Sequence, residues 1–442
     1  MADRAVSDSP AVQAQLDRLA ALSPGNDILG LERIAALLGR LGNPERALPP
    51  VLHVAGTNGK GSTCAFLRAA IEAAGLETHV YTSPHLVRFN ERIRIGGTLI
   101  ADEALAALLE ETLAAADGME ISFFEATTAA AFLAFARAPA EACIVEVGLG
   151  GRLDATNVIP APAVCGIAQL GLDHQSFLGS RIEQIAAEKA GIAKPGVPLV
   201  TQLYPQQIAD TIADVADAAG AIWLPRGGTW DAAVARQQLH YRDADGTLDL
   251  PLPRLRGAHQ ATNAGLAVAM LRHQQAIRVP EAALKAAMGW ADWPARLQRL
   301  GEGPLHALLP AASELWLDGG HNPAAARAVA DWFRAHVPAD RPFHIVFGLL
   351  TNKDVAGVLK PFQGRSVTFH PIPIEGHEHH ATADLTRAAK ESGLSAVPAG
   401  GVEEALGWIA RHADRARPPI VLVFGSLYLA GQVLRGNGQM PT

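Results

Sequence analysis

A glycine-rich segment with a single lysine is the clearest chemical signal in the chain. The segment GTNGKGS directly follows the apolar run VLHVA (51–55) and precedes the helical pattern AFLRAAIEAAG (65–75). Glycines at such a turn let backbone N–H groups approach phosphate oxygens, and the helix N-terminus favours negative charge. The lysine can reach the β- and γ-phosphates of a nucleotide. The sequence therefore predicts a phosphate-binding loop made of Gly56, Thr57, Asn58, Gly59, Lys60, Gly61 and Ser62.

The loop differs from the common GxxxxGK[ST] pattern, because Gly61 stands between the lysine and Ser62. The alternative is a glycine-rich turn with a surface lysine, which would give three glycines at a strand–helix junction little purpose. A G-protein switch would also need an NKxD sequence that reads the base. The chain contains TNKD (351–354), but Val355 stands where the final aspartate should be. We interpret TNKD as a loop after the strand FHIVFGL (343–349).

One carboxylate, Glu146, lies inside the apolar run ACIVEVGLGG (142–151). A charge within a buried strand needs a partner, and ligands of open α/β sheets bind beyond the carboxyl ends of the strands. Glu146 is therefore a candidate ligand, and the alternative is a carboxylate that caps the next turn.

Seven segments occur in an order that resembles the folylpolyglutamate synthase/dihydrofolate synthase family of the Mur ligase superfamily. The resemblance covers about residues 28–431 and implies ATP-dependent ligation of L-glutamate to dihydropteroate, or to the γ-carboxyl of a folate, through an acyl phosphate. The segments are HVAGTNGKGST (53–63), TSPHLVRFNERIRI (82–95), VEVGLGGRLDATN (145–157), LGLDHQSFLG (170–179), AEKAGI (187–192), DGGHNP (318–323) and VFGSLYLAG (423–431).

The resemblance implies two Mg²⁺ ions. Ser83 and Glu146 would share one, and His174 would bind the second with Glu146 bridging. It also implies that Lys189 is carbamylated by CO₂, which yields an oxygen ligand or a phosphate-positioning group. Carbamylation needs a lysine whose pKa is lowered by burial or by nearby cations. From the residues alone, the serine could be a turn residue, the histidine structural and the lysine a solvated helix residue.

Further contacts follow from the same resemblance. Asn263 would contact adenine, although it could also be a helix-start cap. Arg296 would meet the ATP phosphates from the link between two domains, where the family more often has glycine in place of Ala295. Asp318 would contact the nucleotide from the C-terminal domain.

The acyl acceptor and the incoming glutamate have their own candidate residues. His321 would act near the glutamate or the acyl phosphate, and Ser426 could hold the glutamate unless it is only a helix cap. The pterin-bearing acid would contact three short segments, whose two phenylalanines also fit plain core packing. The segments consist of Ile28, Leu29 and Gly30, of Phe123, Phe124 and Glu125, and of Leu153, Asp154 and Ala155.

These residues need an alternating α/β framework to position them. Strands are expected at 78–83, 142–151, 163–171 and 197–202, and helices at 31–42, 65–75, 123–138, 182–192 and 259–273. Such alternation predicts a mostly parallel sheet covered on both faces. The first ~25 residues look like a polar, Ala-rich lead-in, and 222–256 like short antiparallel strands with a turn at Asp245-Gly246.

The α/β pattern restarts after WADWPARLQRL (290–300), which we interpret as the link between domains. Strands are expected at 314–320, 343–349, 366–372 and 419–426. We therefore expect two domains: residues 1–294, a P-loop domain of the Mur-ligase central type that binds ATP and the pterin, and residues 295–442, a smaller Rossmann-like α/β domain. The resemblance places the reaction in the cleft between them.

Composition sets the broad class. The chain has 442 residues, a formal net charge of −7 and three cysteines far apart in the sequence. These features argue against a broad nucleic-acid surface and against a disulfide or zinc framework. No secretory leader or uninterrupted apolar stretch of ~18 residues is visible. We expect a cytoplasmic, monomeric enzyme whose partners are small molecules, with no nucleic acid and no membrane.

Three other readings remain at this point. The chain could be a folylpolyglutamate synthase without the dihydrofolate synthase activity, or a Mur-type ligase with another acceptor. It could also be a nucleotide-dependent interaction protein without ligase chemistry. HEHH (377–380) lies outside the family pattern and fits a solvated loop better than a metal site, because adjacent residues suit no single tetrahedral ion.

Overall fold

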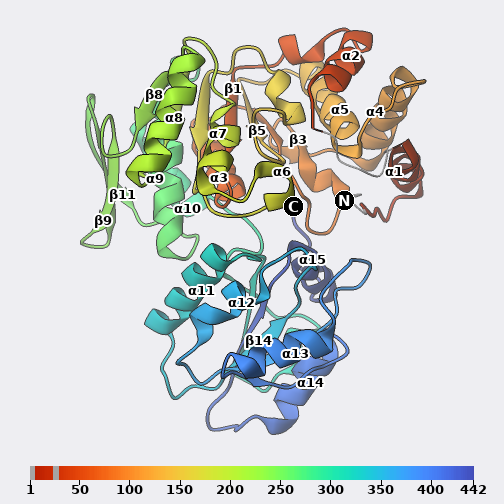
Figure 1. Ribbon diagram of the computed structural model, residues 1–442, viewed down its shortest axis with the longest axis vertical. Helices are drawn as coiled ribbons and strands as arrows, with labels where there is room; N and C mark the ends of the chain where they lie inside the picture. Colours follow the sequence, from red (N-terminus) through yellow and green to blue (C-terminus); the bar gives the residue numbers. More distant parts are fainter. Residues whose placement is uncertain (1–4, 23–28) are drawn as a thin grey trace. The chain divides into compact units, whose positions relative to one another are not determined.

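The computed structural model describes residues 5–22 and 29–442 (Figure 1). The chain divides into two compact units, which we describe separately. The first takes in the chain up to Arg254 together with His259–Asp292 and Thr442, and the second takes in Leu255–Ala258 and Trp293–Pro441. The first unit thus gives up four residues, 255–258, to the second, and the second begins two residues before the expected boundary at 295.

An eight-stranded sheet forms the middle of the first unit, in the order β4-β3-β2-β5-β1-β6-β7-β8. The strands from β2 to β8 in this order run parallel, and β3 and β4 add an antiparallel edge. The central strands are buried along their whole length, which explains their continuous apolar runs. The bounds are β1 Val51–Ala55, β2 Thr78–Tyr81, β3 Ile93–Ile95, β4 Thr98–Leu99, β5 Ala142–Glu146, β6 Val164–Ile167, β7 Pro198–Thr201 and β8 Ile222–Pro225.

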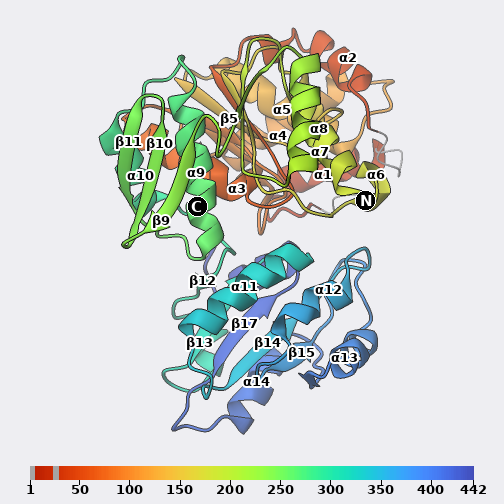
Figure 2. The ribbon, with the colours of Figure 1, turned by 60° about the vertical axis from the view of Figure 1, so that its left-hand side comes forward.

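Helices cover this sheet on both faces, as Figures 1 and 2 show. Their bounds are α1 Pro10–Leu22, α2 Glu32–Arg40, α3 Lys60–Ala73, α4 Asp102–Ala115, α5 Phe123–Arg137, α6 Gln175–Leu178, α7 Ile182–Ala190, α8 Gln206–Ala218, α9 Ala258–Arg272 and α10 Glu281–Trp290. Short 3₁₀ turns occupy Pro44–Arg46, Phe89–Arg92 and Ala155–Val158.

The description of the first ~25 residues as a polar, Ala-rich lead-in missed the helix α1. Val12, Leu16 and Leu19 recur at helical spacing and are buried in the core that α4 and α5 also line. Many alanines diluted this stripe in the sequence, but three apolar residues on one face are enough to dock a helix.

The segment 222–256 is also only partly as expected. β8 extends the parallel sheet beside β7 and is not one of the antiparallel strands. The antiparallel sheet consists of β9 Asp231–Ala235, β10 Gln238–Asp243 and β11 Gly246–Pro251. Asp243 pairs with Gly246, so the turn lies one residue earlier than expected, at 244–245.

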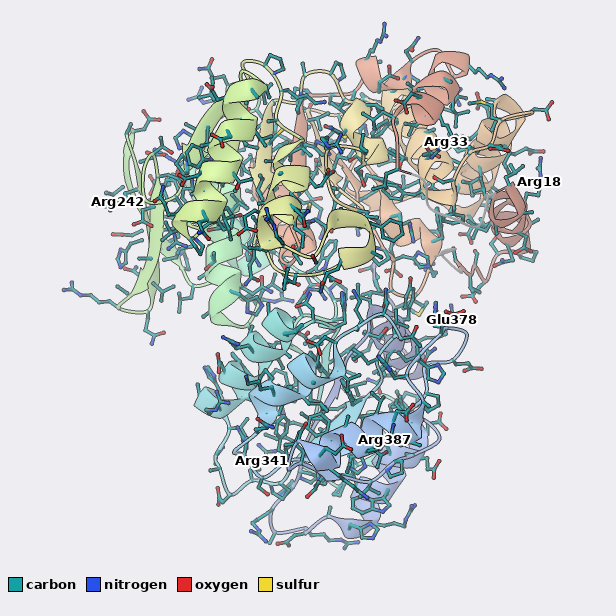
Figure 3. All side chains as sticks on the ribbon, viewed as in Figure 1. Arg18, Arg33, Arg242, Arg341, Glu378 and Arg387 are labelled. Carbon is teal, nitrogen blue, oxygen red and sulfur yellow. The ribbon has the colours of Figure 1, made fainter. Side chains whose placement is uncertain are left out.

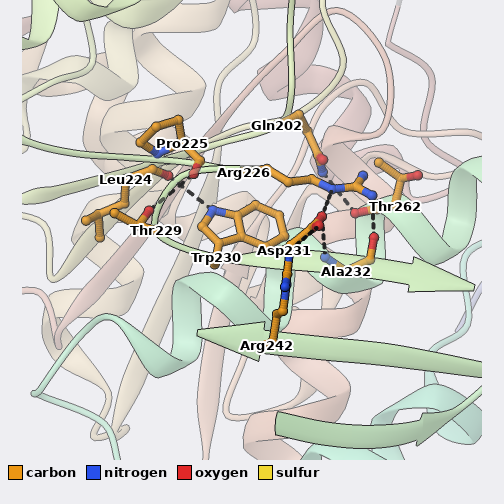
Figure 4. Close-up of polar contacts among 10 residues, drawn as sticks. All are labelled: Gln202, Leu224, Pro225, Arg226, Thr229, Trp230, Asp231, Ala232, Arg242 and Thr262. Atoms are coloured by element: carbon orange, nitrogen blue, oxygen red, sulfur yellow. Dashed lines mark hydrogen bonds and ion pairs between the residues drawn. The ribbon is translucent and has the colours of Figure 1, made fainter. Parts of the chain in front are cut away.

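Arg226 joins the two sheets of the first unit (Figure 4). Its backbone N–H donates to Thr201 O of β7 at 2.9 Å, and its Nε donates to Asp231 Oδ1 of β9 at 3.0 Å. Trp230 Nε1 donates to Leu224 O at 3.1 Å. The chain therefore leaves β8 and enters β9 at a fixed angle.

The second unit has a six-stranded sheet in the order β12-β13-β17-β14-β15-β16, parallel except for β12. Its strands are β12 Gln298–Arg299, β13 Glu314–Asp318, β14 Phe343–Phe347, β15 Thr368–Pro371, β16 Ser395–Ala396 and β17 Ile420–Phe424. Its helices are α11 Pro323–His336, α12 Val355–Leu359, α13 Thr382–Glu391, α14 Val402–His412 and α15 Leu427–Gly436. The α/β fold class predicted from the sequence is confirmed in both units. Within the described residues, no helix combines the length and apolarity needed to cross a membrane.

Candidate active site

The phosphate loop connects β1 to α3, which begins at Lys60. Two of its glycines cannot carry a side chain. Gly56 has φ +153°, and a Cβ there would lie 2.9 Å from the Cβ of Ala168. Gly59 has φ +84°, and a Cβ there would lie 2.4 Å from Asn263 Oδ1. The glycine-rich sequence is therefore required both by backbone conformation and by close packing.

The phosphate loop is tied to the loop that follows β6. Backbone N–H groups of Thr57 and Asn58 both donate to Gln169 O, at 2.8 and 3.1 Å. The Thr57 hydroxyl donates to Gly171 O at 3.0 Å, and its oxygen accepts from Gly171 N–H at 3.1 Å. These bonds fix the start of the segment that carries Asp173 and His174.

Lys60 and Glu146 meet at the carboxyl edge of the sheet. Glu146 is the last residue of β5, is buried, and pairs in register with Val54 of β1. Lys60 Nζ lies 3.9 Å from Glu146 Oε1 and donates to Gly56 O at 3.3 Å. The sheet therefore holds the loop lysine beside the buried carboxylate.

Ser83 lies at the same edge. β2 pairs with β5 in parallel, with Tyr81 opposite Val145, so Ser83 follows its strand beside the end of β5. Hydroxyl and carboxylate oxygens are the hard donors that Mg²⁺ prefers. Ser83 and Glu146 therefore carry donors of the kind that suits Mg²⁺, and an ion shared between them stays a prediction.

Lys189 is buried, so its reading as a solvated helix residue is wrong. It lies in the last turn of α7 with only 5% of its surface exposed. Burial first, and then the Lys60 charge, lower its pKa to about 7, while Asp173, Asp154 and Glu188 oppose the shift. A lysine with this pKa is partly neutral near physiological pH, which is the state that reacts with CO₂.

The turn after β5 packs directly on this helix. A Cβ at Gly151 would lie 2.7 Å from Glu188 O and 2.9 Å from Lys189 O. The backbone N–H of Arg152 donates to Glu188 O at 2.8 Å. The GLGG sequence thus lets the turn reach the backbone beside Lys189.

His174 differs in place from the expectation. It follows β6 by seven residues rather than directly, is exposed, and has φ +51° at the start of the short helix α6. Its backbone N–H donates to Asp173 Oδ1 at 2.9 Å. Sequence reasoning had not singled out Asp173, whose charge acts on Lys189. Its place in a loop beyond a parallel strand was the available signal.

Asn263 lies in the second turn of α9, so it is not a helix-start cap. It is buried, its Nδ2 donates to Gln260 Oε1 at 3.1 Å, and its amide lies against Gly59. The structure brings it to the phosphate loop, and its contact with adenine stays a prediction.

The predicted acceptor residues fall into two groups. Phe123 is buried against Phe89 with ring centroids 6.0 Å apart, as core packing requires. Glu125 closes a capping box with Ser122 and pairs at 3.0 Å with Arg33, which Figure 3 labels, so its carboxylate is engaged within the fold. These contacts explain both residues structurally.

The second group borders the turn after β5. Phe124 is half-buried and lies where a Cβ at Gly148 would come within 2.5 Å of its ring. Asp154 is buried, while Leu153 is half-buried and Ala155 buried beside it. Leu29 and Gly30 are half-buried before α2, and Ile28 lies outside the described residues.

The backbone at Ala295 explains why glycine is the more common residue of the family at this position. Ala295 has φ +55° and is fully buried, and Arg296 Nη1 donates to Ala295 O at 2.9 Å. A left-handed residue favours glycine, so an alanine here carries strain of about 1 kcal/mol.

Asp318 ends β13 and uses both oxygens within the unit. Oδ2 accepts from Leu297 N–H and Oδ1 from Gly320 N–H, each at 2.8 Å. His321 Nδ1 donates to Gly319 O at 3.1 Å. Ser426 caps α15 by accepting from Tyr428 N–H at 3.1 Å, as its alternative reading held.

The two remaining motifs pack on each other. TNKD is a loop in which Asp354 caps α12, and His380 of HEHH donates its backbone N–H to Leu349 O at 2.9 Å. The HEHH histidines are half-buried, so the loop is less solvated than expected. Across 5–22 and 29–442, no three His, Cys, Asp or Glu side chains gather closely enough to hold a metal ion.

Comparison with known proteins gives consistent matches over most of the chain. Residues 305–436 match the family model described as dihydrofolate synthetase, C-terminal domain. A protein of Escherichia coli (strain K12) named dihydrofolate synthase/folylpolyglutamate synthase is 36% identical over 92% of this chain and 90% of its own. The protein of the same name from Bacillus subtilis (strain 168) is 32% identical, over 91% and 94%.

Solved structures agree with these matches. E. coli FolC in complex with DHPP and ADP superposes with a TM-score of 0.86 at 34% identity, covering 97% of each chain. A bifunctional folylpolyglutamate synthase/dihydrofolate synthase with Mn, AMPPNP and L-glutamate bound has a TM-score of 0.84 at 32% identity, covering 98% of this chain and 99% of its own.

Proposed function

Since this chain belongs to the dihydrofolate synthase/folylpolyglutamate synthase family, we propose how its own residues carry out the family's reaction. The enzyme is an ATP-dependent ligase that joins L-glutamate to a folate-type acid. A carboxylate is a poor acyl donor, so the γ-phosphoryl group of ATP is transferred to it first, and the amine of glutamate then displaces phosphate. We propose that both dihydropteroate and folates are acceptors, as the names of the E. coli and B. subtilis relatives suggest.

The phosphate loop binds and orients the triphosphate in this proposal. Its backbone N–H groups and the start of α3 hold the phosphates, and Lys60 stabilises the charge that develops on the transferred group. The observation that carries the assignment is the placement of Lys60 3.9 Å from Glu146 at the carboxyl edge of β1 and β5.

Divalent metal is the second component of the proposal. Ser83 and Glu146 would hold one Mg²⁺, and His174 would hold a second one that Glu146 bridges. Bound Mg²⁺ would neutralise the charge of the phosphates during transfer. AMPPNP and Mn in the related bifunctional enzyme support metal use.

Lys189 supplies the third component. We propose that its neutral amine takes up CO₂ and that the resulting carbamate completes the metal and phosphate environment. The buried position and the pKa of about 7 support this role. Removal of CO₂ and bicarbonate should lower turnover, and bicarbonate should restore it. Intact-protein mass spectrometry should find one added CO₂ on the wild type and none on Lys189→Ala. Equal turnover with and without CO₂ would contradict the carbamate.

Two residues of the second unit keep their predicted roles in this proposal, and two others take mainly structural ones. Arg296 would meet the phosphates, and His321 would act near the glutamate. Asp318 would serve mainly by holding the backbone next to Arg296 and His321, because its two oxygens accept the N–H groups of the neighbouring Leu297 and Gly320. Ser426 would order the start of α15, and its contact with glutamate would be secondary.

The test is ADP formation with ATP, Mg²⁺ and L-glutamate, offering dihydropteroate and a reduced folate monoglutamate separately. Turnover with both supports the bifunctional assignment. Turnover with the folate alone would make the chain a folylpolyglutamate synthase, and turnover with neither would point to another Mur-type acceptor.

Lys60→Ala and Glu146→Ala should each reduce this turnover at least about 100-fold while the protein stays folded. Lys285→Ala is the matched control, because Lys285 is exposed and pairs with Glu281 at 2.7 Å along α10. Circular dichroism and the melting temperature monitor folding in all three. Retained activity in either site variant would contradict the assignment.

A further inference from the structure

One fully buried histidine lies on the central strand of the first unit and has no part in the mechanism above. His53 is on β1, three residues before Gly56, and none of its surface is exposed. Its Nε2 lies 2.8 Å from Thr156 Oγ1. Its Nδ1 is buried without a hydrogen-bond partner in the described part of the chain. A buried imidazole with one nitrogen unpaired costs free energy, and loss of its single hydrogen bond would leave both nitrogens unpaired.

The direction of that hydrogen bond follows from its neighbours. The Thr156 hydroxyl donates to Asp154 Oδ1 at 2.5 Å. Because a hydroxyl has one hydrogen, Thr156 must accept from His53 Nε2–H. Neutral histidine carries one N–H, so Nδ1 is then bare, which agrees with its lack of a partner. Burial, and then the Lys194 charge, lower the pKa of His53 to about 3, so the imidazole stays neutral at pH 7.

Asp154 connects Thr156, the hydrogen-bond partner of His53, to the turn after β5. Its Oδ1 also accepts from Thr156 N–H at 3.0 Å, and its Oδ2 accepts from Leu149 N–H at 2.8 Å. The carboxylate therefore holds both ends of the segment 148–156. That segment contains Leu153 and Ala155, and its Gly148 lies against Phe124.

We propose that His53 is a positioning residue for the acceptor acid: through Thr156 and Asp154 it fixes the segment 148–156 relative to β1, the strand that leads into the phosphate loop. The inference rests on the proposed function and on the predicted contacts of Leu153, Asp154 and Ala155 with the acceptor acid. Phosphoryl transfer needs the acceptor carboxylate about 3–3.5 Å from the γ-phosphorus, so a small displacement of the segment weakens productive binding.

Steady-state kinetics of two His53 variants test the proposal. His53→Leu fills the space without a donor, and His53→Gln keeps an N–H near the position of Nε2. We expect His53→Leu to raise the KM for the acceptor about tenfold, the loss of one hydrogen bond, with the KM for ATP within about twofold. His53→Gln should restore the acceptor KM to within about threefold of wild type.

Thr156 provides a second, independent set of variants. Thr156→Val removes the hydroxyl at constant shape, and Thr156→Ser retains it. If the two residues act through one chain of hydrogen bonds, His53→Leu with Thr156→Val should be no worse than either alone. Additive effects on the acceptor KM would overturn the proposal.

Amide hydrogen exchange separates this inference from the proposed function, because it needs no substrate. The peptide covering 148–156 should exchange faster in His53→Leu than in wild type and in His53→Gln, while β1 stays protected. Unchanged exchange and unchanged acceptor KM would overturn the inference. The inference would also be overturned if His53→Leu raised the KM for every substrate equally and lowered the melting temperature, and if His53→Gln did not restore either quantity. Absence of turnover in the wild type would count against the proposed function alone.

Discussion

At the scale of single residues, the phosphate loop depends on glycines, which have no Cβ atom. Gly59 and Gly75 both have left-handed backbones, with φ +84° and +78°, at the two ends of α3. Only Gly59 faces a neighbour, since a Cβ there would lie 2.4 Å from Asn263 Oδ1, whereas a Cβ at Gly75 would meet nothing within 4 Å. The pair therefore separates backbone strain from steric displacement.

Gly59→Ala should lower ATP-dependent turnover at least about tenfold, because the methyl group displaces Asn263 from the loop in addition to straining the backbone. Gly75→Ala should share only the strain, costing about 1–2 kcal/mol of stability and leaving turnover within about twofold. Titration of ATP binding and melting curves of both variants measure the difference. Similar KM values for ATP in the two variants would contradict this account.

For single residues, the sequence predicted where site residues lie in the fold better than which residues they contact. Lys60 and Glu146 could be placed because Lys60 lies in the turn after one apolar strand and Glu146 ends another, and parallel strands end at one edge. The burial of Lys189 could not be predicted, because the segments packed around the end of α7, such as the turn at Gly151, lie far away in the sequence. The same holds for Asp318, whose two backbone partners come from different segments.

At the scale of elements, the antiparallel sheet is fastened to α9 by a buried ion pair. Asp243, at the end of β10, has no exposed side-chain surface, and Arg272 of α9 binds it with two hydrogen bonds of 2.6 and 2.7 Å. Tyr241 donates its hydroxyl to the same carboxylate at 3.0 Å. Arg242 makes a looser pair with Asp231 at 3.5 Å and is 72% exposed (Figure 4).

Arg272→Met should destabilise the protein by about 3–5 kcal/mol, because it leaves the Asp243 carboxylate buried without its cation. Arg242→Met should change stability by less than about 0.5 kcal/mol, since an exposed pair contributes little. Urea denaturation followed by Trp fluorescence compares the two. A loss below about 1 kcal/mol in Arg272→Met would show that water or another cation replaces the arginine.

Periodicity predicted most helices and parallel strands, because their apolar patterns are continuous and their ends carry glycine or proline. It failed for α1, where alanines hide a narrow apolar stripe, and for β8, a short strand that directly precedes the antiparallel strands in the sequence. The assignment of β8 depends on which strand it pairs with, and the local pattern does not contain that information.

At the scale of the whole molecule, the second unit contains a histidine pair that responds to acid. His344 of β14 and His370 of β15 are linked by a 3.0 Å bond between Nδ1 and Nε2. His370 Nδ1 donates to Val397 O at 3.1 Å, so its Nε2 accepts from His344. Burial lowers the pKa of both imidazoles to about 4, with His344 adding to the shift at His370.

Stability should therefore fall as the pH drops from about 6.5 to about 4. In that window the unfolded histidines bind protons and the folded pair does not, so each contributes up to about 1.4 kcal/mol per pH unit. The contribution is fully present above pH 6.5. Melting temperatures between pH 4 and 8 measure this loss of stability. The double variant that combines His344→Phe and His370→Leu should show a smaller change of melting temperature with pH. An unchanged slope would assign the acid sensitivity to other groups.

The three cysteines also have a consequence for experiments on this enzyme. Cys64, Cys143 and Cys165 are fully buried, and burial raises the pKa of each thiol above its usual range. Thiolates are the reactive species, so maleimide reagents should leave the native chain unmodified. If one cysteine is then engineered at an exposed position of each unit, labels would attach at these two positions. A spin or fluorophore pair attached there would measure the distance between the units with and without nucleotide, in an otherwise natural sequence.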